Sequence, residues 1–247
     1  MPKKTDMAEL RDLAKTFLHF EPMSTPLAPV VIKHPFTDSA LVGIRQPDGS
    51  HAIGNILDSQ EDMQAWRKQQ SEVIDRVKSP LLFAFLVTNS YALGFLKYAQ
   101  QYLSKEDLSE MLAYMWVNTE APNQDCNLSK TKLLSMFKAA DPKSVMTEEE
   151  YQKFQNLDQQ LTVYRGVTSY NADNIKALSW TLDPDKAFWF AHRFGEEGAV
   201  YEAQISKEHV YAYFEGRNEA EVIVDPKHLT DITQVQEQSQ GFAMALL

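Results

Sequence analysis

The stretch LTVYRGV, residues 161–167, places an arginine in a segment that otherwise predicts a β-strand. In an extended chain alternate residues face the same way, so Arg165 shares its face with the aliphatic residues Leu161, Val163 and Val167. A guanidinium keeps its proton and is costly to bury without a partner. The stretch therefore predicts a carboxylate or a phosphate facing Arg165, either in an internal Arg–Glu pair or on a bound ligand.

The sequence changes character near this stretch. Runs rich in Val, Tyr, Ile and Phe predict strands at 161–167, 176–182, 199–205, 209–214 and 220–224. One helix interrupts these strands, with Asp183 as N-cap and Pro184 at its first position. Earlier in the chain, apolar residues at helical spacing predict helices at 6–18, from 58 onward, and at 80–102, 105–118, 129–139 and 147–156.

These patterns predict an α+β fold with three parts. Residues 1–157 form a mainly helical N-terminal region, in which five prolines between residues 20 and 57 indicate an irregular or β-containing segment. Residues 158–232 form a β-rich core, and residues 233–247 form a tail. Asp58–Glu61 and Thr147–Glu150 have the spacing of capping boxes, which predicts where two of the helices begin.

The composition limits the classes of partner. The net charge is -10, and residues 161–247 carry 7 Lys and Arg against 13 Asp and Glu. Such a surface has no general attraction for nucleic acid or anionic lipid, so a polyanion must be met by a local basic pocket. The most apolar stretch, residues 81–96, is shorter than a membrane span and is interrupted by polar residues, which favours a core helix and no membrane association.

Several cofactor sites are excluded by their missing motifs. Cys126 is the single cysteine, which excludes an internal disulfide and a Cys-rich zinc site. No GxGxxG, P-loop, HExxH or EF-hand pattern occurs, and the six histidines are scattered, so we expect no metal. The lone cysteine and an N-terminal stretch without a secretory pattern indicate a cytoplasmic setting, including a bacterial cytoplasm that the protein acts in or is delivered to.

Two further pieces carry chemistry. In KALSWTL, residues 176–182, the face that contains Ser179 and Thr181 is small and polar. In the predicted strand near residue 220, Glu219 and Glu221 fall on one face, where two carboxylates repel each other unless a cation or a reacting group lies between them.

In order and spacing, Tyr164–Gly166, Ser179–Thr181 and Glu219–Glu221 resemble the R-S-E class of mono-ADP-ribosyltransferases, which includes bacterial and phage toxins. The resemblance covers about residues 160–226 and implies a split β-sandwich that binds NAD as co-substrate. Each of the three pieces alone is common by chance, and only their combination in predicted strands is specific.

The resemblance implies a role for each motif residue. Arg165 binds the NAD phosphates, since a forked and permanently charged donor suits a pyrophosphate. Glu221 bonds the ribose 2′-hydroxyl and stabilises the positive charge that develops on the sugar as nicotinamide leaves. Ser179 orients Glu221 or the ribose, Thr181 supports it, and Glu219 activates the incoming nucleophile.

Neighbours of these residues complete the expected NAD site. Gly166 adjoins the phosphate-binding arginine, and Trp180 and Trp189 are candidates to stack on nicotinamide. His192 and Arg193 either add positive charge toward NAD or belong to a solvated helix face.

The identity of the acceptor stays open. Glu219, two residues before Glu221, favours transfer of ADP-ribose to a protein arginine. The alternatives are a base of RNA or DNA, as in toxins and phage-defence enzymes, or water, which would make the protein an NAD glycohydrolase. A non-catalytic binding module is the alternative outside enzymes. The helical region shapes acceptor recognition, binds an antitoxin-like inhibitor, or supports the β-rich core.

Overall fold

The computed structural model describes residues 3–195 and 198–235, and the chain divides into two compact units, Met1–Thr147 and Glu148–Leu247. Each unit is described by itself. Helices combine with antiparallel sheets, in agreement with the predicted α+β class. None of the described helices has the length and apolar character needed to cross a membrane.

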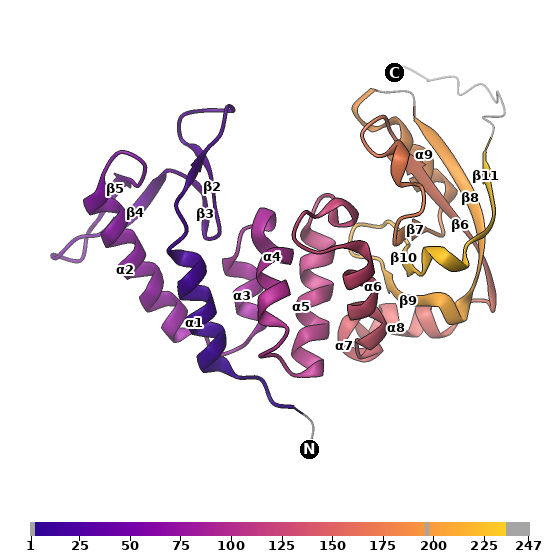
Figure 1. Ribbon diagram of the computed structural model, residues 1–247, viewed down its shortest axis with the longest axis horizontal. Helices are drawn as coiled ribbons and strands as arrows, with labels where there is room; N and C mark the ends of the chain where they lie inside the picture. Colours follow the sequence, from indigo (N-terminus) through magenta and orange to yellow (C-terminus); the bar gives the residue numbers. More distant parts are fainter. Residues whose placement is uncertain (1–2, 196–197, 236–247) are drawn as a thin grey trace, which may run out of the picture. The chain divides into compact units, whose positions relative to one another are not determined.

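The first unit is mainly helical (Figure 1). Its helices are α1 (Met7–Leu18), α2 (Gln60–Arg76), α3 (Leu81–Leu86), α4 (Asn89–Ala99), α5 (Lys105–Asn118), α6 (Lys130–Ala139) and α7 (Pro142–Val145), with a 3₁₀ turn at Pro122–Gln124. Between α1 and α2 lie the strands β1 (Met23–Ser24), β2 (Val31–His34), β3 (Thr37–Ser39), β4 (Leu41–Arg45) and β5 (His51–Asn55). The proline-rich segment thus forms the small sheets β1-β2-β3 and β4-β5.

The helices of this unit begin and end for identifiable reasons. Ser59, not Asp58, caps α2, because its hydroxyl accepts the backbone N–H of Asp62 while Asp58 bonds the side chain of Asn55. The single helix expected at 80–102 is divided into α3 and α4. Thr88 is extended at the break, and its backbone N–H bonds the carbonyl of Pro35 at 2.8 Å, a partner that is distant in sequence.

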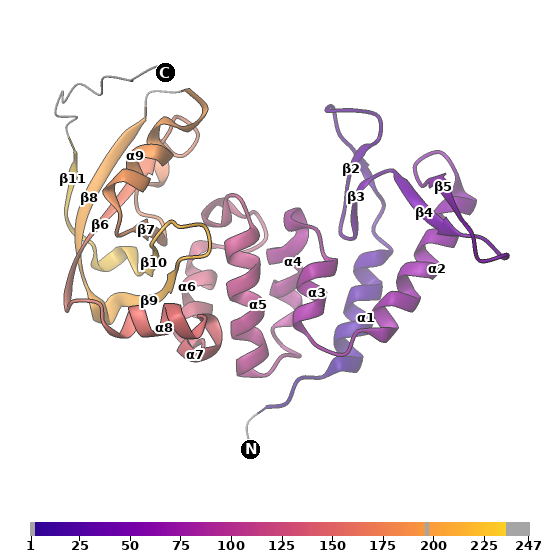
Figure 2. The same cartoon turned by 180° about the vertical axis from the view of Figure 1, so that it is seen from behind.

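The second unit is built on one sheet (Figure 2). Its elements are α8 (Glu148–Gln155), β6 (Gln160–Val167), β7 (Ser179–Thr181), α9 (Pro184–His192), β8 (Ala199–Ser206), β9 (Val210–Phe214), β10 (Glu221–Val224) and β11 (Thr230–Gln234), with 3₁₀ turns at Ala172–Asn174, Arg193–Gly195, Lys207–His209 and Pro226–His228. The sheet has the order β11-β8-β6-β7-β10-β9, and neighbouring strands are antiparallel.

This sheet has two well-paired halves with a weak joint between them. Strand β6 pairs with β8 along its whole length, from Gln160 to Val167, and β10 pairs with both β7 and β9. Between β6 and β7, however, the aligned pair is Tyr164 with Thr181. The sheet therefore consists of the halves β11-β8-β6 and β7-β10-β9, which meet at the strands that carry two of the three motifs.

Helix α9 packs unusually closely on the first half. Asp183 caps it as predicted, by accepting the backbone N–H of Asp185 at 2.9 Å. A Cβ on Gly166 would lie 2.1 Å from the carbonyl oxygen of Ala187, and a Cβ on Gly198 would lie 2.1 Å from that of Ala191. The two glycines thus allow the helix backbone to approach the strands.

Both predicted boundaries of the β-rich core lie elsewhere in the structure. Helix α8, expected in the N-terminal region, belongs to the second unit, which begins at Glu148. Residues 233–235, which were expected in the tail, instead continue the sheet, because β11 extends to Gln234 and Val235 donates a backbone hydrogen bond to Val200. Residues 236–247 of the predicted tail lie outside the described residues.

Candidate functional site

The fold places the three motifs on neighbouring strands. Arg165 lies in β6, Ser179 begins β7 and Glu221 begins β10, and these strands are consecutive in the sheet. Cross-strand registers align Thr181 with Glu221 on one side and with Tyr164 on the other. Residues that are 56 positions apart in the sequence, from 165 to 221, therefore meet at the joint between the two halves of the sheet.

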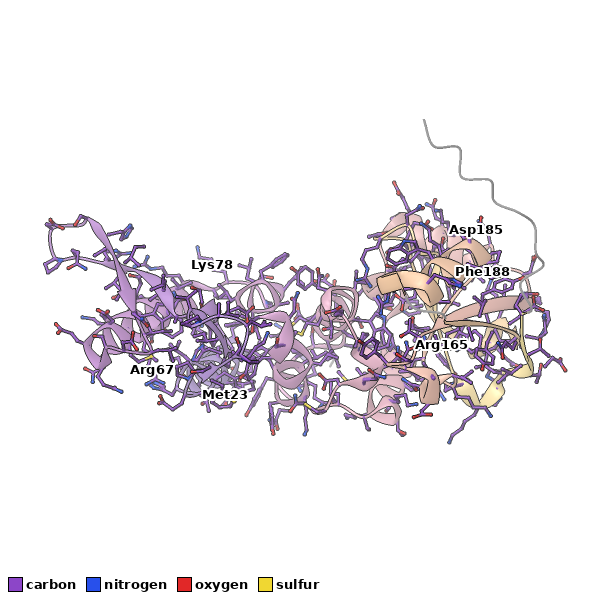
Figure 3. The ribbon with its side chains drawn as sticks, turned by 90° about the horizontal axis from the view of Figure 1, so that it is seen from above. Met23, Arg67, Lys78, Arg165, Asp185 and Phe188 are labelled. Atoms are coloured by element: carbon purple, nitrogen blue, oxygen red, sulfur yellow. The ribbon has the colours of Figure 1, made fainter. Side chains whose placement is uncertain are left out.

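Arg165 is held by backbone carbonyls. Its Nη1 donates to the carbonyl oxygen of Ser179 at 2.7 Å, and its Nε donates to that of Asn174 at 3.3 Å. Because Gly166 faces α9, alternation along β6 directs Arg165 to the face of the strand that α9 does not cover. Figure 3 shows Arg165 within the body of the unit, whereas Asp185 and Phe188 lie on α9.

The charge of Arg165 is only partly compensated by an acid. Burial lowers the pKa of Arg165 to about 10, the carboxylate of Glu221 raises it, and the nearby Arg193 lowers it further. The guanidinium stays charged at neutral pH. The carboxylate expected near Arg165 is thus that of Glu221, whose negative charge favours the charged guanidinium. The two hydrogen bonds of Arg165 go to backbone carbonyls, which a pattern of side chains does not predict.

The residues of β7 have different surroundings. Ser179 is half-buried and aligned with Ile223 of β10. The hydroxyl of Thr181 is buried; it donates to the carbonyl oxygen of Glu219 at 2.6 Å and accepts the backbone N–H of Asp183 at 3.0 Å. Thr181 therefore connects the loop before β10 to the start of α9.

The two glutamates are not successive residues of one strand face, contrary to the prediction. Strand β10 begins at Glu221, which is 7% exposed, and Glu219 lies in the preceding loop. Between them Ala220 has φ 43°, a left-handed conformation that breaks the period of two. Asn218 is also left-handed, with φ 53°. Glu219 is consequently flanked on both sides by left-handed residues.

The loop at residues 215–220 is fixed at both ends. At its start, Glu215 accepts a hydrogen bond from Lys153 of α8 at 3.0 Å, and its backbone N–H donates to Glu150 at 2.8 Å. At its end, Thr181 holds the carbonyl of Glu219, and Leu182 N–H bonds the carbonyl of Ala220 at 3.0 Å. A left-handed alanine persists only where surrounding contacts determine the backbone, and these contacts do so.

Glu219 lies among cations. Its Oε1 is 3.1 Å from Nε of Arg217, and its side chain is 18% exposed. Burial raises the pKa of Glu219, while Arg217, Arg193 and Lys186 act in the opposite direction. Arg193 affects both Arg165 and Glu219, so these groups belong to one electrostatic cluster within an otherwise acidic unit.

The three other residues expected at an NAD site, Gly166, Trp180 and Trp189, have different surroundings from one another. Gly166 is required for the packing of α9, as described above. Trp180 is 2% exposed, and its indole N–H is bonded to the carbonyl of Ala177 at 3.1 Å, so its ring belongs to the core. Trp189, by contrast, is 61% exposed on α9 and makes an edge-to-face contact with Phe190. Of the two tryptophans, only Trp189 has a ring that is accessible from solvent.

Sequence reasoning missed the residues that surround Glu219. Arg217 and Lys186 were not among the predicted site residues, and Arg193 was assigned either to the site or to a solvated face. Arg217 had a sequence signal, since it precedes Glu219 by two residues in a glycine-containing turn. Lys186 had none, because only the packing of α9 against the sheet brings it near the loop. Among the described residues, no three His, Cys, Asp or Glu side chains are grouped to hold a metal ion.

No protein-family model, curated protein or solved structure matches this chain. The inference about function therefore rests on the residues and their arrangement. Three features of that arrangement matter most: a half-buried arginine on β6, a half-buried serine on the next strand β7 with a buried glutamate on β10 beyond it, and a second glutamate on a strained loop.

Proposed function

We propose that the second unit is a mono-ADP-ribosyltransferase, a glycosyltransferase that cleaves NAD at the bond between nicotinamide and ribose and transfers ADP-ribose to a protein arginine. The observation that carries the proposal is the convergence of Arg165, Ser179 and Glu221 on β6, β7 and β10, with Glu219 held beside them. The division of the sheet at the β6–β7 joint supports the split β-sandwich that the resemblance implies.

NAD binding would use the local positive charge. Arg193 is close enough to lower the pKa of Arg165, and a pyrophosphate bound by both side chains would offset that repulsion. The exposed ring of Trp189 is the candidate for stacking on nicotinamide. These cations would supply the local positive charge that an acidic chain needs in order to bind a phosphate-containing molecule.

The reaction would proceed through a sugar with developing positive charge. The ribose C1′–nicotinamide bond breaks, nicotinamide leaves with the bonding electron pair, and a guanidinium nitrogen of the acceptor forms the new bond to C1′. Glu221, buried at the start of β10, would stabilise the charged sugar through the ribose 2′-hydroxyl. The acceptor nitrogen loses one proton, which Glu219 would take or pass to solvent.

An arginine acceptor is favoured by the contact that Glu219 already makes. Its carboxylate binds a guanidinium, that of Arg217, at 3.1 Å while 18% of its side chain remains exposed. A carboxylate placed in this way suits the forked donor geometry of arginine better than a nucleic-acid base.

The proposal is tested with NAD labelled in its adenylate phosphate, incubated with the protein and a bacterial lysate. Wild-type protein should transfer label to material that protease, but not nuclease, releases. Glu221→Gln keeps the shape of the side chain and removes its charge, so kcat should fall by roughly 10²–10³-fold, the range for loss of one electrostatic contact to a transition state.

The matched control is Glu202→Gln, the same change at a half-buried position in β8 of the same sheet. It should retain activity, and circular dichroism should show that both variants are folded. Label released only by nuclease would assign the acceptor to RNA or DNA, and nicotinamide release without label transfer would indicate a glycohydrolase. Absence of nicotinamide release from wild-type protein would refute the enzymatic proposal.

A further inference from the structure

Arg217 lies beside Glu219, where the proposed reaction requires an acceptor arginine. Its Nε is 3.1 Å from Oε1 of Glu219, the group to which we assign the binding and activation of the nucleophile. The Arg217 side chain is 49% exposed, so its terminal nitrogens are accessible while Nε is engaged. The chain thus carries its own guanidinium at the acceptor carboxylate.

The backbone holds this contact in place. Residues 216–218 are exposed, but the backbone N–H of Asn218 bonds the carbonyl of Glu215 at 2.6 Å, which closes a turn around Arg217. Hydrogen bonds to Glu215 and Glu219 fix the two ends of the loop, as described above. Arg217 is therefore presented by a fixed turn, which keeps its guanidinium at a high effective concentration beside Glu219.

We propose that Arg217 is a site of automodification, at which the protein transfers ADP-ribose from NAD to its own side chain. The inference rests on the proposed function of the same site. A terminal guanidinium nitrogen of Arg217 forms a bond to ribose C1′ as the C1′–nicotinamide bond breaks. Nicotinamide departs with the electron pair, and the attacking nitrogen releases one proton to Glu219 or to water.

Automodification at this position has a distinctive kinetic form. The nucleophile is tethered two residues from Glu219, so the reaction occurs within one molecule and its rate constant does not depend on protein concentration. Modification also attaches a bulky, negatively charged ADP-ribose group to the guanidinium beside Glu219. The modified protein should therefore transfer ADP-ribose to other acceptors more slowly than the unmodified protein does.

The experiment incubates the purified full chain with NAD in the absence of lysate and locates ADP-ribose by peptide mass spectrometry. Wild-type protein should carry it on Arg217, with a first-order rate constant that stays the same over a wide range of protein concentrations. Arg217→Lys should reduce total self-labelling by roughly tenfold or more, because the tethered guanidinium is lost. The matched control is Arg76→Lys, which changes an exposed arginine that is also paired with a glutamate, Glu72, at 3.9 Å.

A parallel measurement of nicotinamide release with lysate separates the two proposals. If wild-type protein labels lysate proteins but leaves Arg217 unmodified, automodification is refuted and the proposed function stands. A first-order rate constant for labelling of Arg217 that rises with protein concentration would also refute it, since such a dependence indicates reaction between molecules. If nicotinamide is not released under either condition, the proposed function fails and the automodification proposal fails with it.

Discussion

The two units differ in where they depart from regular structure. In the first unit, the departures are in side chains: Arg11 Nε and His34 Nε2 are buried without a hydrogen-bond partner among the described residues. Its described backbone contains no non-glycine residue with positive φ. The second unit departs in its backbone, where Asn218, Ala220 and Asp231 are left-handed.

The two kinds of irregularity have different surroundings. A buried nitrogen without a hydrogen-bond partner lowers the stability of the first unit, and no left-handed residue adjoins either of the two nitrogens. Two of the three left-handed residues of the second unit flank Glu219, beside the cations that surround its carboxylate. Strain that gathers around one ionisable side chain, and is held there by tertiary hydrogen bonds, is typical of a functional site.

The largest effect is expected where α9 meets β6. Gly166→Ala would place a Cβ 2.1 Å from the carbonyl oxygen of Ala187 and 2.7 Å from the nitrogen of Ala191, and neither backbone atom can move without moving the helix. We expect a loss of about 3 kcal/mol in the free energy of unfolding, at the upper end of the range for overpacking. Urea unfolding followed by circular dichroism measures it.

The first unit provides the control for this change. Gly43→Ala in β4 has no atom within 4 Å of the new Cβ, so it should be neutral or stabilising by about 0.5 kcal/mol. If Gly166→Ala also proved neutral, the close approach of α9 to the sheet would be wrong. The assignment of Arg165 to the face of β6 that α9 leaves uncovered would then fail as well.

The elements of the second unit were predictable because they follow from local signals. Alternating apolar residues predicted β6, and Asp183 followed by Pro184 predicted the start of α9 correctly. The same alternation was wrong at Glu219, because Ala220 adopts φ 43° under hydrogen bonds from Thr181 and Leu182 of another strand region. A conformation imposed by residues about 40 positions away has no local signal.

In the candidate site, too, some features follow from local sequence and others from contacts between distant elements. The motif residues Arg165, Ser179 and Glu221 could be named from sequence, and the sheet order brings their strands together. Trp180 could not be separated from Trp189 by sequence, since both are tryptophans near the motif and only burial distinguishes them. The residue type of Gly166 is explained by the contact with α9, a relation between elements that a motif does not contain.

The next effect concerns the pH dependence of stability, to which His34 in the first unit and Glu219 in the second should contribute with opposite signs. Burial lowers the pKa of His34 to about 4. The nearby carbonyls of Leu18 and Phe20 act to raise this pKa, but neither accepts a hydrogen bond from Nε2. The unfolded chain binds a proton at its ordinary pKa, so stability is lost as pH falls from about 6.5 toward 4, by up to about 2–3 kcal/mol.

Glu219 has the opposite sign. Burial raises its pKa, so the folded state retains a proton that the unfolded state releases, and stability falls as pH rises through the folded pKa. His34→Gln should therefore flatten the loss of stability in acid, and Glu219→Gln should raise stability near neutral pH but not in acid. Urea unfolding across the pH range measures both, with His51→Gln at an exposed site of β5 as control. If the free energy of unfolding depended on pH in the same way for wild-type protein and Glu219→Gln, the raised pKa of the half-buried Glu219 carboxylate would be contradicted.

The smallest effect tests the strain at Ala220 directly. A left-handed alanine costs roughly 1–2 kcal/mol, which glycine avoids, whereas glycine increases the entropy of the unfolded chain. Ala220→Gly should therefore stabilise the protein by about 0.5–1 kcal/mol and still reduce transferase activity, because the loop would hold Glu219 less rigidly. The same substitution at Ala212, buried in the regular strand β9, should destabilise the protein. Opposite signs for one substitution at two positions of one unit would locate the strain at the loop. Loss of stability at both positions would mean that the backbone at Ala220 is relaxed and that the contrast between the two units does not mark a functional site.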